Sequence, residues 1–216
     1  MIYTFDYQIL SLTKANIDVV DIDYQMTSWL NVIYKENNNI KIITNDVRKT
    51  DVSKYNKIIA NLPYNVTTEL IVFLLNFATN AKKLVLMCQS ETFEHFFQTS
   101  GSEYGPTSVL IHLLGNIKKE VVVKAGSFVP APKCNSTVFS IQISEDANFN
   151  QATNVYKFAK ALFVNRRKTI LNNLTLYLKN KENALLALTK LSINPQTRPE
   201  NISPEQYLNL FKNLSY

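Results

Sequence analysis

A proline that follows a short apolar run is the feature that most constrains this chain. Lys57-Ile58-Ile59-Ala60 is typical of the end of a buried strand, and Asn61-Leu62-Pro63-Tyr64-Asn65 follows at once. Pro63 lacks an N–H and has a fixed φ, and it keeps Leu62 out of the helical region, so the strand must end in a stiff corner. In an open α/β sheet such a corner lies at the carboxyl edge, where ligands bind.

The corner combines groups that suit a planar amine. The Asn61 side-chain oxygen can accept an N–H bond, and so can the main-chain carbonyl of Ala60 or Leu62. The Tyr64 ring can stack on a flat base. The alternative is an ordinary strand-to-loop corner with a buried tyrosine, because asparagine and proline are common in turns. The five residues alone favour that alternative, and the rest of the chain has to decide.

Two earlier apolar runs also end in acids. Residues 17–23 and 40–43 are predicted strands. The first ends in Asp21 and Asp23, and Asp46 follows shortly after the second. An acid at this edge of a nucleotide-binding sheet can accept ribose hydroxyls or an adenine amino group. The alternatives are local, because Asp23 suits a helix cap and Asp46 suits a turn. We prefer the cap for Asp23, and the residues alone leave Asp21 balanced between the two roles.

Strand and helix patterns alternate up to residue 143, which indicates an α/β domain over residues 1–147. The pattern predicts helices at 69–77, 90–97 and 107–114, strands at 57–60, 83–87, 118–124 and 136–143, and loops at 99–107 and 126–133. Beyond a polar stretch the pattern is only helical, which indicates a second domain over residues 148–216. Residues 155–178 are predicted as a helix with a basic side, and a last helix runs through Tyr207.

Charge and cysteine content restrict the partners. The net charge of +6 and a pI near 9.2 fit either a solvated surface or a polyanionic partner such as nucleic acid. Cys88 and Cys134 have no metal-ligand or disulfide spacing, so we expect free buried thiols of a reducing cytoplasm and no metal. No signal peptide is evident, and no apolar stretch is long enough to span a membrane.

Several further motifs occur in a fixed order along the chain. Asn61–Thr68 is followed by Gln89-Ser90-Glu91, Tyr104-Gly105, Ser108-Val109-Leu110, Gly126–Lys133 with Ser136, Phe163 with Arg166–Thr169, Asn172-Asn173-Leu174 and Arg198-Pro199-Glu200. In this order they resemble the rRNA adenine dimethyltransferases of the KsgA and Erm superfamily. The C-terminal motifs favour the KsgA branch over the Erm resistance enzymes.

The resemblance implies a Rossmann-like methyltransferase sheet followed by a small all-helical domain. It implies transfer of methyl groups from S-adenosylmethionine to N6 of two adjacent adenosines near the 3′ end of 16S rRNA. The partner would be the immature small ribosomal subunit, and the enzyme would be a cytoplasmic monomer. Two alternatives stay open: an rRNA-binding assembly factor without catalysis, and an Erm-type 23S rRNA methyltransferase.

The resemblance also assigns roles to residues by matching motifs. Asp21 with Ile22, Asp46 with Val47, and Asn61 match cofactor-binding positions. The catalytic corner is Asn61, Leu62, Pro63 and Tyr64, and the target base would stack between Tyr64 and Phe128. The basic residues predicted to contact RNA are Lys133, Lys157, Lys160, Arg166, Arg167 and Lys168.

One part of the family pattern has no counterpart in this sequence. The family's sheet begins with a strand that leads into a Gly-X-Gly-X-Gly loop, whereas the first of the four glycines here is Gly101. Met1 to Thr13 occupies the position expected for the end of that loop and its helix. We therefore expect an N-terminally truncated chain without the first strand and the glycine loop, and cofactor binding becomes the property to test.

Overall fold

The computed structural model describes residues 15–214, and these fall into two compact units. The first unit ends at Val52 and the second begins at Ser53. The predicted remnant of a cofactor loop at Met1–Thr13 lies outside the described residues. The predicted boundary at residue 147 lies in the turn after the last strand, and it stays a prediction because the division at Val52 concerns another part of the chain.

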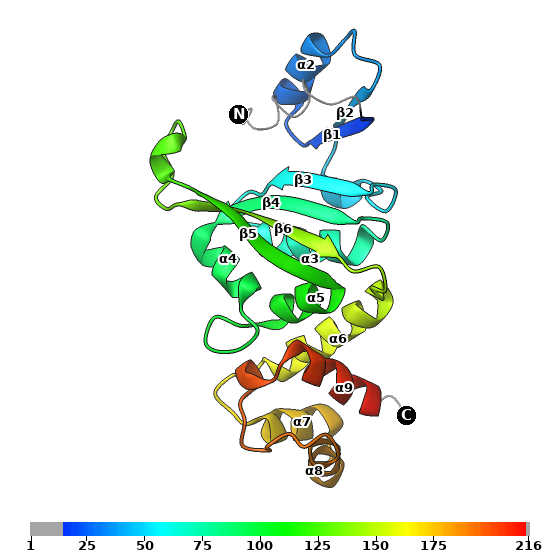
Figure 1. The fold of residues 1–216 in the computed structure, drawn as a ribbon, viewed down its shortest axis with the longest axis vertical. Coiled ribbons are helices and arrows are strands. Elements are labelled where there is room, and N and C mark those ends of the chain that lie inside the picture. Colours follow the sequence, from blue (N-terminus) through cyan, green and yellow to red (C-terminus); the bar gives the residue numbers. More distant parts are fainter. Residues whose placement is uncertain (1–14, 215–216) are drawn as a thin grey trace. The chain divides into compact units, whose positions relative to one another are not determined.

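The first unit pairs two parallel strands and packs one helix against them (Figure 1). Its elements are β1 (Ile17–Asp21), α2 (Tyr24–Ile33), β2 (Ile40–Thr44) and a 3₁₀ turn, η1 (Val47–Lys49). The predicted helix cap is confirmed, because the Asp23 carboxylate accepts from the backbone N–H groups of Gln25 at 2.8 Å and Met26 at 3.3 Å. β1 and β2 end together, with Asp21 opposite Thr44.

The second unit contains the remaining elements in a βα alternation followed by helices. They are β3 (Lys57–Asn61), α3 (Thr67–Phe77), β4 (Lys83–Gln89), α4 (Ser90–Phe97), α5 (Pro106–Leu114), β5 (Gly115–Val123), η2 (Ala125–Ser127), β6 (Ser136–Ile143), α6 (Phe149–Leu162), α7 (Ile170–Leu178), α8 (Lys181–Lys190), η3 (Pro199–Asn201) and α9 (Pro204–Leu214). Each strand predicted over residues 57–143 occurs here, within a few residues of its expected bounds. Among residues 15–214 no helix has both the length and the apolar character that crossing a membrane requires.

The sheet of the second unit is mixed. Its strand order is β3-β4-β6-β5, with β3 parallel to β4 and β6 antiparallel to both of its neighbours. Figure 1 shows α3, α4 and α5 on one side of this sheet. Alternate residues of β4 face these helices, so Leu84, Leu86 and Cys88 are fully buried. The carboxyl ends of β3 and β4 therefore lie beside the start of β6.

The two cysteines are free thiols, as expected. Cys88 is buried, and the burial raises the pKa of its thiol to about 12, so it stays protonated at neutral pH. Cys134 is only half-buried, in the loop before β6. The expectation that both thiols are buried is therefore confirmed for Cys88 and wrong for Cys134.

The C-terminal helices share an apolar core with α5. Aromatic rings form its centre: Phe158 contacts Tyr207 edge-on, and Phe163 stacks on Tyr207 at a centroid distance of 5.8 Å. Tyr104, which precedes α5, joins them through an edge contact with Phe163. This core joins the helical region to the sheet-bearing part of the second unit.

The predicted single helix over residues 155–178 is wrong, because the chain leaves the helix at Phe163 and starts α7 at Ile170. The Thr169 side chain caps α7 by accepting from the N–H of Asn172. The buried Asn173 amide donates to the carbonyls of Asn165 and Thr169, at 3.2 and 3.1 Å, which holds the turn in place. These bonds satisfy backbone groups that a continuous helix would have paired by itself.

We expect Gly115→Ala to lower the free energy of unfolding by about 2 kcal/mol or more. The added methyl group would overlap backbone atoms, and the overlap can be relieved only by moving the backbone. A Cβ on Gly115 would lie 2.0 Å from the carbonyl oxygen of Gln142 on the paired strand. Urea unfolding followed by circular dichroism measures the effect. Gly126→Ala is the control, since a Cβ there meets nothing within 4 Å. Equal midpoints for the two variants would contradict the predicted close approach.

Candidate functional site

The corner after β3 is held by backbone bonds on both sides. Leu62, which is buried, donates its N–H to the carbonyl of Met87 at 3.0 Å, so pairing with β4 continues past the end of β3. The carbonyl of Pro63 accepts from the N–H of Val66 at 3.2 Å and from the hydroxyl of Thr67 at 2.9 Å. The chain therefore passes from strand to helix within five residues, and the corner is stiff, as predicted.

Asn61 stands at this corner as the last residue of β3, half-buried. Within residues 15–214 its side-chain amide has no hydrogen-bond partner. A half-buried amide on a stiff corner offers an acceptor oxygen and two donors to an incoming group. The exocyclic amine of a purine has the complementary donors.

Tyr64 lies three residues further on, and a bond at its far end fixes its ring. Its hydroxyl lies 2.7 Å from Oγ of Ser136, the first residue of β6. Ser136 is fully buried and pairs with Gln89 on one side and Val123 on the other. The half-buried Tyr64 ring is thus held by the corner at one end and by the sheet at the other.

Phe128 follows η2, in the loop that connects β5 to β6. It is half-buried, and its N–H donates to the carbonyl of Ala125 at 3.2 Å. The Asn135 side chain accepts from the N–H of Ala125 at 3.1 Å, and the Asn135 carbonyl accepts from the N–H of Ser90 at 3.0 Å. Residues 135 and 136 therefore contact both the turn that carries Phe128 and the Tyr64 hydroxyl.

The acids predicted to hold the cofactor lie in the first unit, at the carboxyl ends of its two strands. Asp21 is half-buried, and its Oδ1 accepts from the N–H of Asp23 at 2.8 Å. Ile22, the next residue, is 71% exposed and offers an apolar surface beside the carboxylate. A carboxylate next to an exposed aliphatic side chain fits the hydroxyls and flat base of a nucleoside.

Asp46 has a local role that the sequence analysis had left open. It caps η1 by accepting from the N–H of Arg48 at 2.9 Å, and the Arg48 guanidinium lies 2.6 Å from its Oδ2. The side-chain bond from Arg48 is the main cause that lowers the pKa of Asp46 to about 2. The adjacent Val47 is half-buried. A contact of Asp46 with adenine stays a prediction, and it would share this carboxylate with Arg48.

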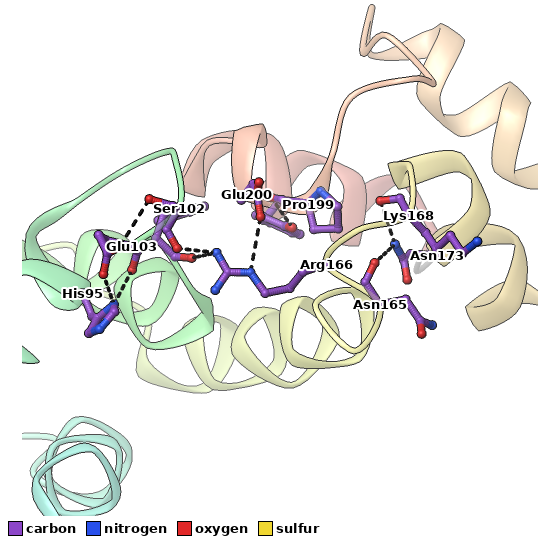
Figure 2. A network of polar contacts seen from close by, with 11 residues as sticks. His95, Ser102, Glu103, Asn165, Arg166, Lys168, Asn173, Pro199 and Glu200 are labelled. Atoms are coloured by element: carbon purple, nitrogen blue, oxygen red, sulfur yellow. Dashed lines mark hydrogen bonds and ion pairs between the residues drawn. The ribbon is translucent and has the colours of Figure 1, made fainter.

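The basic residues predicted to contact RNA fall into two groups. Lys133, Lys157, Lys160, Arg167 and Lys168 are exposed, and Lys157 and Lys160 lie one turn apart on α6. Arg166 differs, because its guanidinium turns toward the protein (Figure 2). The predicted basic side of a continuous helix is therefore divided between α6 and the turn before α7.

Arg166 connects three segments that are distant in sequence. Its Nε lies 3.3 Å from a Glu200 carboxylate oxygen, and its terminal nitrogen donates to the carbonyl of Ser102 at 2.6 Å and to that of Tyr104 at 3.1 Å. The guanidinium also lies over the Phe163 ring, 5.6 Å from its centroid. These contacts give Arg166 a structural role, while its contact with RNA stays a prediction.

Sequence reasoning gave no role to two residues that the site uses. Ser136 belongs to a motif, but neither Ser136 nor Asn135 has a predicted role, although both lie where the loop after Pro132 enters a strand. No charge pattern identified Glu200 as the partner of Arg166, because the two residues are 34 positions apart. No sequence signal pointed to the bond between Tyr64 and Ser136, which are 72 residues apart.

Comparison with known proteins decides the family. Residues 8–215 match the family described as ribosomal RNA adenine dimethylase. This chain belongs to that family. The methyl donor of the family is S-adenosylmethionine. The match runs through both units and all the motifs described above.

Two curated relatives share one description with each other. Ribosomal RNA small subunit methyltransferase A of Malacoplasma penetrans is 36% identical over 208 residues, which cover 94% of this chain and 74% of that protein. The protein of the same description from Mycoplasma mycoides is 32% identical over 209 residues, which cover 92% of this chain and 78% of the relative. Both relatives are more than 30% identical to this chain over most of its length.

Solved structures agree on the architecture. A dimethyladenosine transferase from Plasmodium falciparum superposes with a TM-score of 0.79 at 25% identity, covering 97% of this chain and 85% of the other. The 23S rRNA methyltransferase ErmE superposes with a TM-score of 0.69 at 16% identity, covering 99% and 87%. The second likeness shows the fold alone. The predicted Rossmann-like methyltransferase fold with C-terminal helices is confirmed.

We expect Arg48→Met to raise the pKa of Asp46 from about 2 toward 3.8, because it removes the side-chain bond from Arg48, the largest cause that favours the ionised form, while the backbone bond remains. The folded-state pKa is depressed, so the stability that ionised Asp46 contributes is present above pH 3.8 and is lost as the pH falls toward 2. Carboxyl carbon shifts followed by NMR during acid titration measure the pKa. Lys49→Met is the control and should change the pKa less. An unchanged pKa in Arg48→Met would contradict the assignment.

We expect Arg166→Gln to lower the free energy of unfolding by about 1–2 kcal/mol, since it removes charged hydrogen bonds to Glu200, Ser102 and Tyr104. The neighbouring Arg167 is exposed, so Arg167→Gln should change stability by less than about 0.5 kcal/mol. Denaturant unfolding compares the two, and filter binding to rRNA shows whether Arg167→Gln weakens binding. Equal stability of the two variants would refute the structural role of Arg166.

Proposed function

We propose that this chain transfers methyl groups from S-adenosylmethionine to N6 of two adjacent adenosines near the 3′ end of 16S rRNA. It acts on the immature small ribosomal subunit, as a monomer in the cytoplasm. The observation that supports this most directly is the Asn61 amide, which has no hydrogen-bond partner among residues 15–214 and stands on a stiff corner beside a tethered aromatic ring, in a chain of the ribosomal RNA adenine dimethylase family.

When bound, S-adenosylmethionine supplies an electrophilic methyl group carried on a sulfonium. Asp21 with Ile22, Asp46 with Val47, and Asn61 are the residues that would hold it. Both acids lie at the carboxyl ends of β1 and β2, and the half-buried Asp21 carboxylate suits ribose hydroxyls. The exposed Ile22 would offer an apolar surface to one side of the cofactor's base.

The catalytic corner works by holding the nucleophile. An adenine amine is a poor nucleophile, because its lone pair is delocalised into the ring. The Asn61 side-chain oxygen accepts a hydrogen bond from one N–H of the adenine amine, and a main-chain carbonyl of the corner accepts one from the other N–H. The amine nitrogen is therefore held in one orientation. Pro63 and the bond from Leu62 to Met87 keep these acceptors fixed, so the rate gain comes from positioning and electrostatics.

The target base has to leave its stack to reach this corner. Tyr64 and Phe128 offer aromatic faces that compensate for the lost stacking. The exposed residues Lys133, Lys157, Lys160, Arg167 and Lys168 contact rRNA phosphates, which orient the substrate without reading its sequence. Recognition then rests on the shape of the RNA, and chemistry rests on the corner.

The test is methyl transfer from radiolabelled S-adenosylmethionine to small subunits whose rRNA lacks these methyl groups. We expect label in 16S rRNA, as N6,N6-dimethyladenosine at two adjacent positions, mapped by mass spectrometry of nuclease fragments. Asn61→Ala should lower the rate by about 100-fold or more, because it removes an acceptor that positions the amine. Asn80→Ala is the matched control, since this exposed asparagine precedes the other end of β4.

Three other outcomes are informative. Label in 23S rRNA alone would point to an Erm-type activity. RNA binding without any transfer by the wild-type chain would favour an assembly factor without catalysis. A rate in Asn61→Ala equal to that in Asn80→Ala would remove the corner from the mechanism.

A further inference from the structure

Residues 135 and 136 connect the two aromatic residues predicted to stack on the target base. Ser136 holds the Tyr64 hydroxyl, and Asn135 holds the N–H of Ala125, at the start of the turn that precedes Phe128. Neither residue has a role in the proposed chemistry. Ser136 starts the only strand that pairs with both β4 and β5 within the described residues. Asn135 immediately precedes that strand, and its carbonyl accepts from the N–H of Ser90 at 3.0 Å.

The bond between Ser136 and Tyr64 has the properties of a positioning contact. Its length of 2.7 Å is that of a good O–H···O bond, and Ser136 is fully buried. A buried hydroxyl is costly without a partner, so the bond is maintained when the surroundings fluctuate. The corner holds the Cα end of Tyr64, and Ser136 holds the hydroxyl end. The ring then has little freedom to swing away from a base placed against it.

We propose that Ser136 and Asn135 are positioning residues that set the two aromatic sides of the target-base site from a single segment of the chain. The inference rests on the proposed function and adds to it. Ser136 fixes the orientation of the Tyr64 ring through the hydroxyl, and Asn135 fixes the turn that carries Phe128. Neither residue touches the base.

A double-mutant cycle tests whether Ser136 acts through its bond to Tyr64. We expect Ser136→Ala and Tyr64→Phe each to lower kcat by about tenfold, with KM for the small subunit changed less than twofold, because the ring remains but its orientation is no longer fixed. The double variant should be no slower than either single one, because both remove the same bond. If Ser136→Ala acted only by weakening the sheet, it would lower kcat again in the Tyr64→Phe background, and the inference would fall.

Ser140→Ala is the matched control for this cycle. Ser140 lies on the same strand and the same face as Ser136, and its hydroxyl donates to Glu120 at 2.7 Å, so it loses an equivalent bond away from the corner. We expect its kcat to equal that of the wild type. Thermal unfolding of all variants separates a loss of folded protein from a loss of rate. If Ser136→Ala does not fold, Tyr64→Phe alone still removes the bond and tests its effect on kcat.

A binding measurement without methyl transfer separates this inference from the proposed function. The probe is an rRNA fragment with 2-aminopurine in place of one target adenosine, whose fluorescence reports stacking on Tyr64 and Phe128. Ser136→Ala and Asn135→Ala should each change the fluorescence of the bound probe, while Ser140→Ala should not. If the wild-type chain transfers no methyl group but these differences appear, the proposed function fails and the inference stands. Identical fluorescence in all variants would overturn the inference, even in an active enzyme.

Discussion

The antiparallel pairing of β6 with β4 and β5 is the constraint on which the candidate site depends. It places Ser136 between Gln89 and Val123, at the point where β3 and β4 end. From there one buried hydroxyl reaches the Tyr64 hydroxyl, and the preceding Asn135 reaches the turn before Phe128. The parallel pair β3-β4 supplies the corner, but β6 decides where its aromatic ring lies.

The helical region is joined to this arrangement by packing and by one arginine. A shared apolar core connects α5 with α6–α9, and the Arg166 guanidinium contacts the loop before α5 as well as Glu200 before α9. Four of the exposed basic residues, Lys157, Lys160, Arg167 and Lys168, lie on α6 and on the turn that follows it. RNA bound by these residues would therefore be held in a fixed position relative to the sheet, because the helical region and the sheet share a packed core.

Much of the fold could be predicted because its signals are local. Short apolar runs gave the strands, Pro63 gave the corner, and Asp23 gave a helix cap with the expected bonds. The motifs in their order gave the family. The turn at Phe163–Thr169 was missed, because apolar spacing continues across it and the bonds from Asn173 that stabilise it depend on the folded turn. The side-chain roles of Arg166 and Asp46 were incomplete for a similar reason, since each depends on a partner that charge patterns do not identify.

By itself the sequence determined the elements, the stiff corner at Asn61 and the membership of a methyltransferase family. These follow from backbone stereochemistry and residue pattern, which act over a few residues. Only the tertiary structure decided that Tyr64 is bound to Ser136, that Arg166 faces Glu200, and that Gly115 lies against the backbone of Gln142. Such contacts join residues that are distant in sequence, and they form only when strand register and helix packing bring particular atoms within bonding distance.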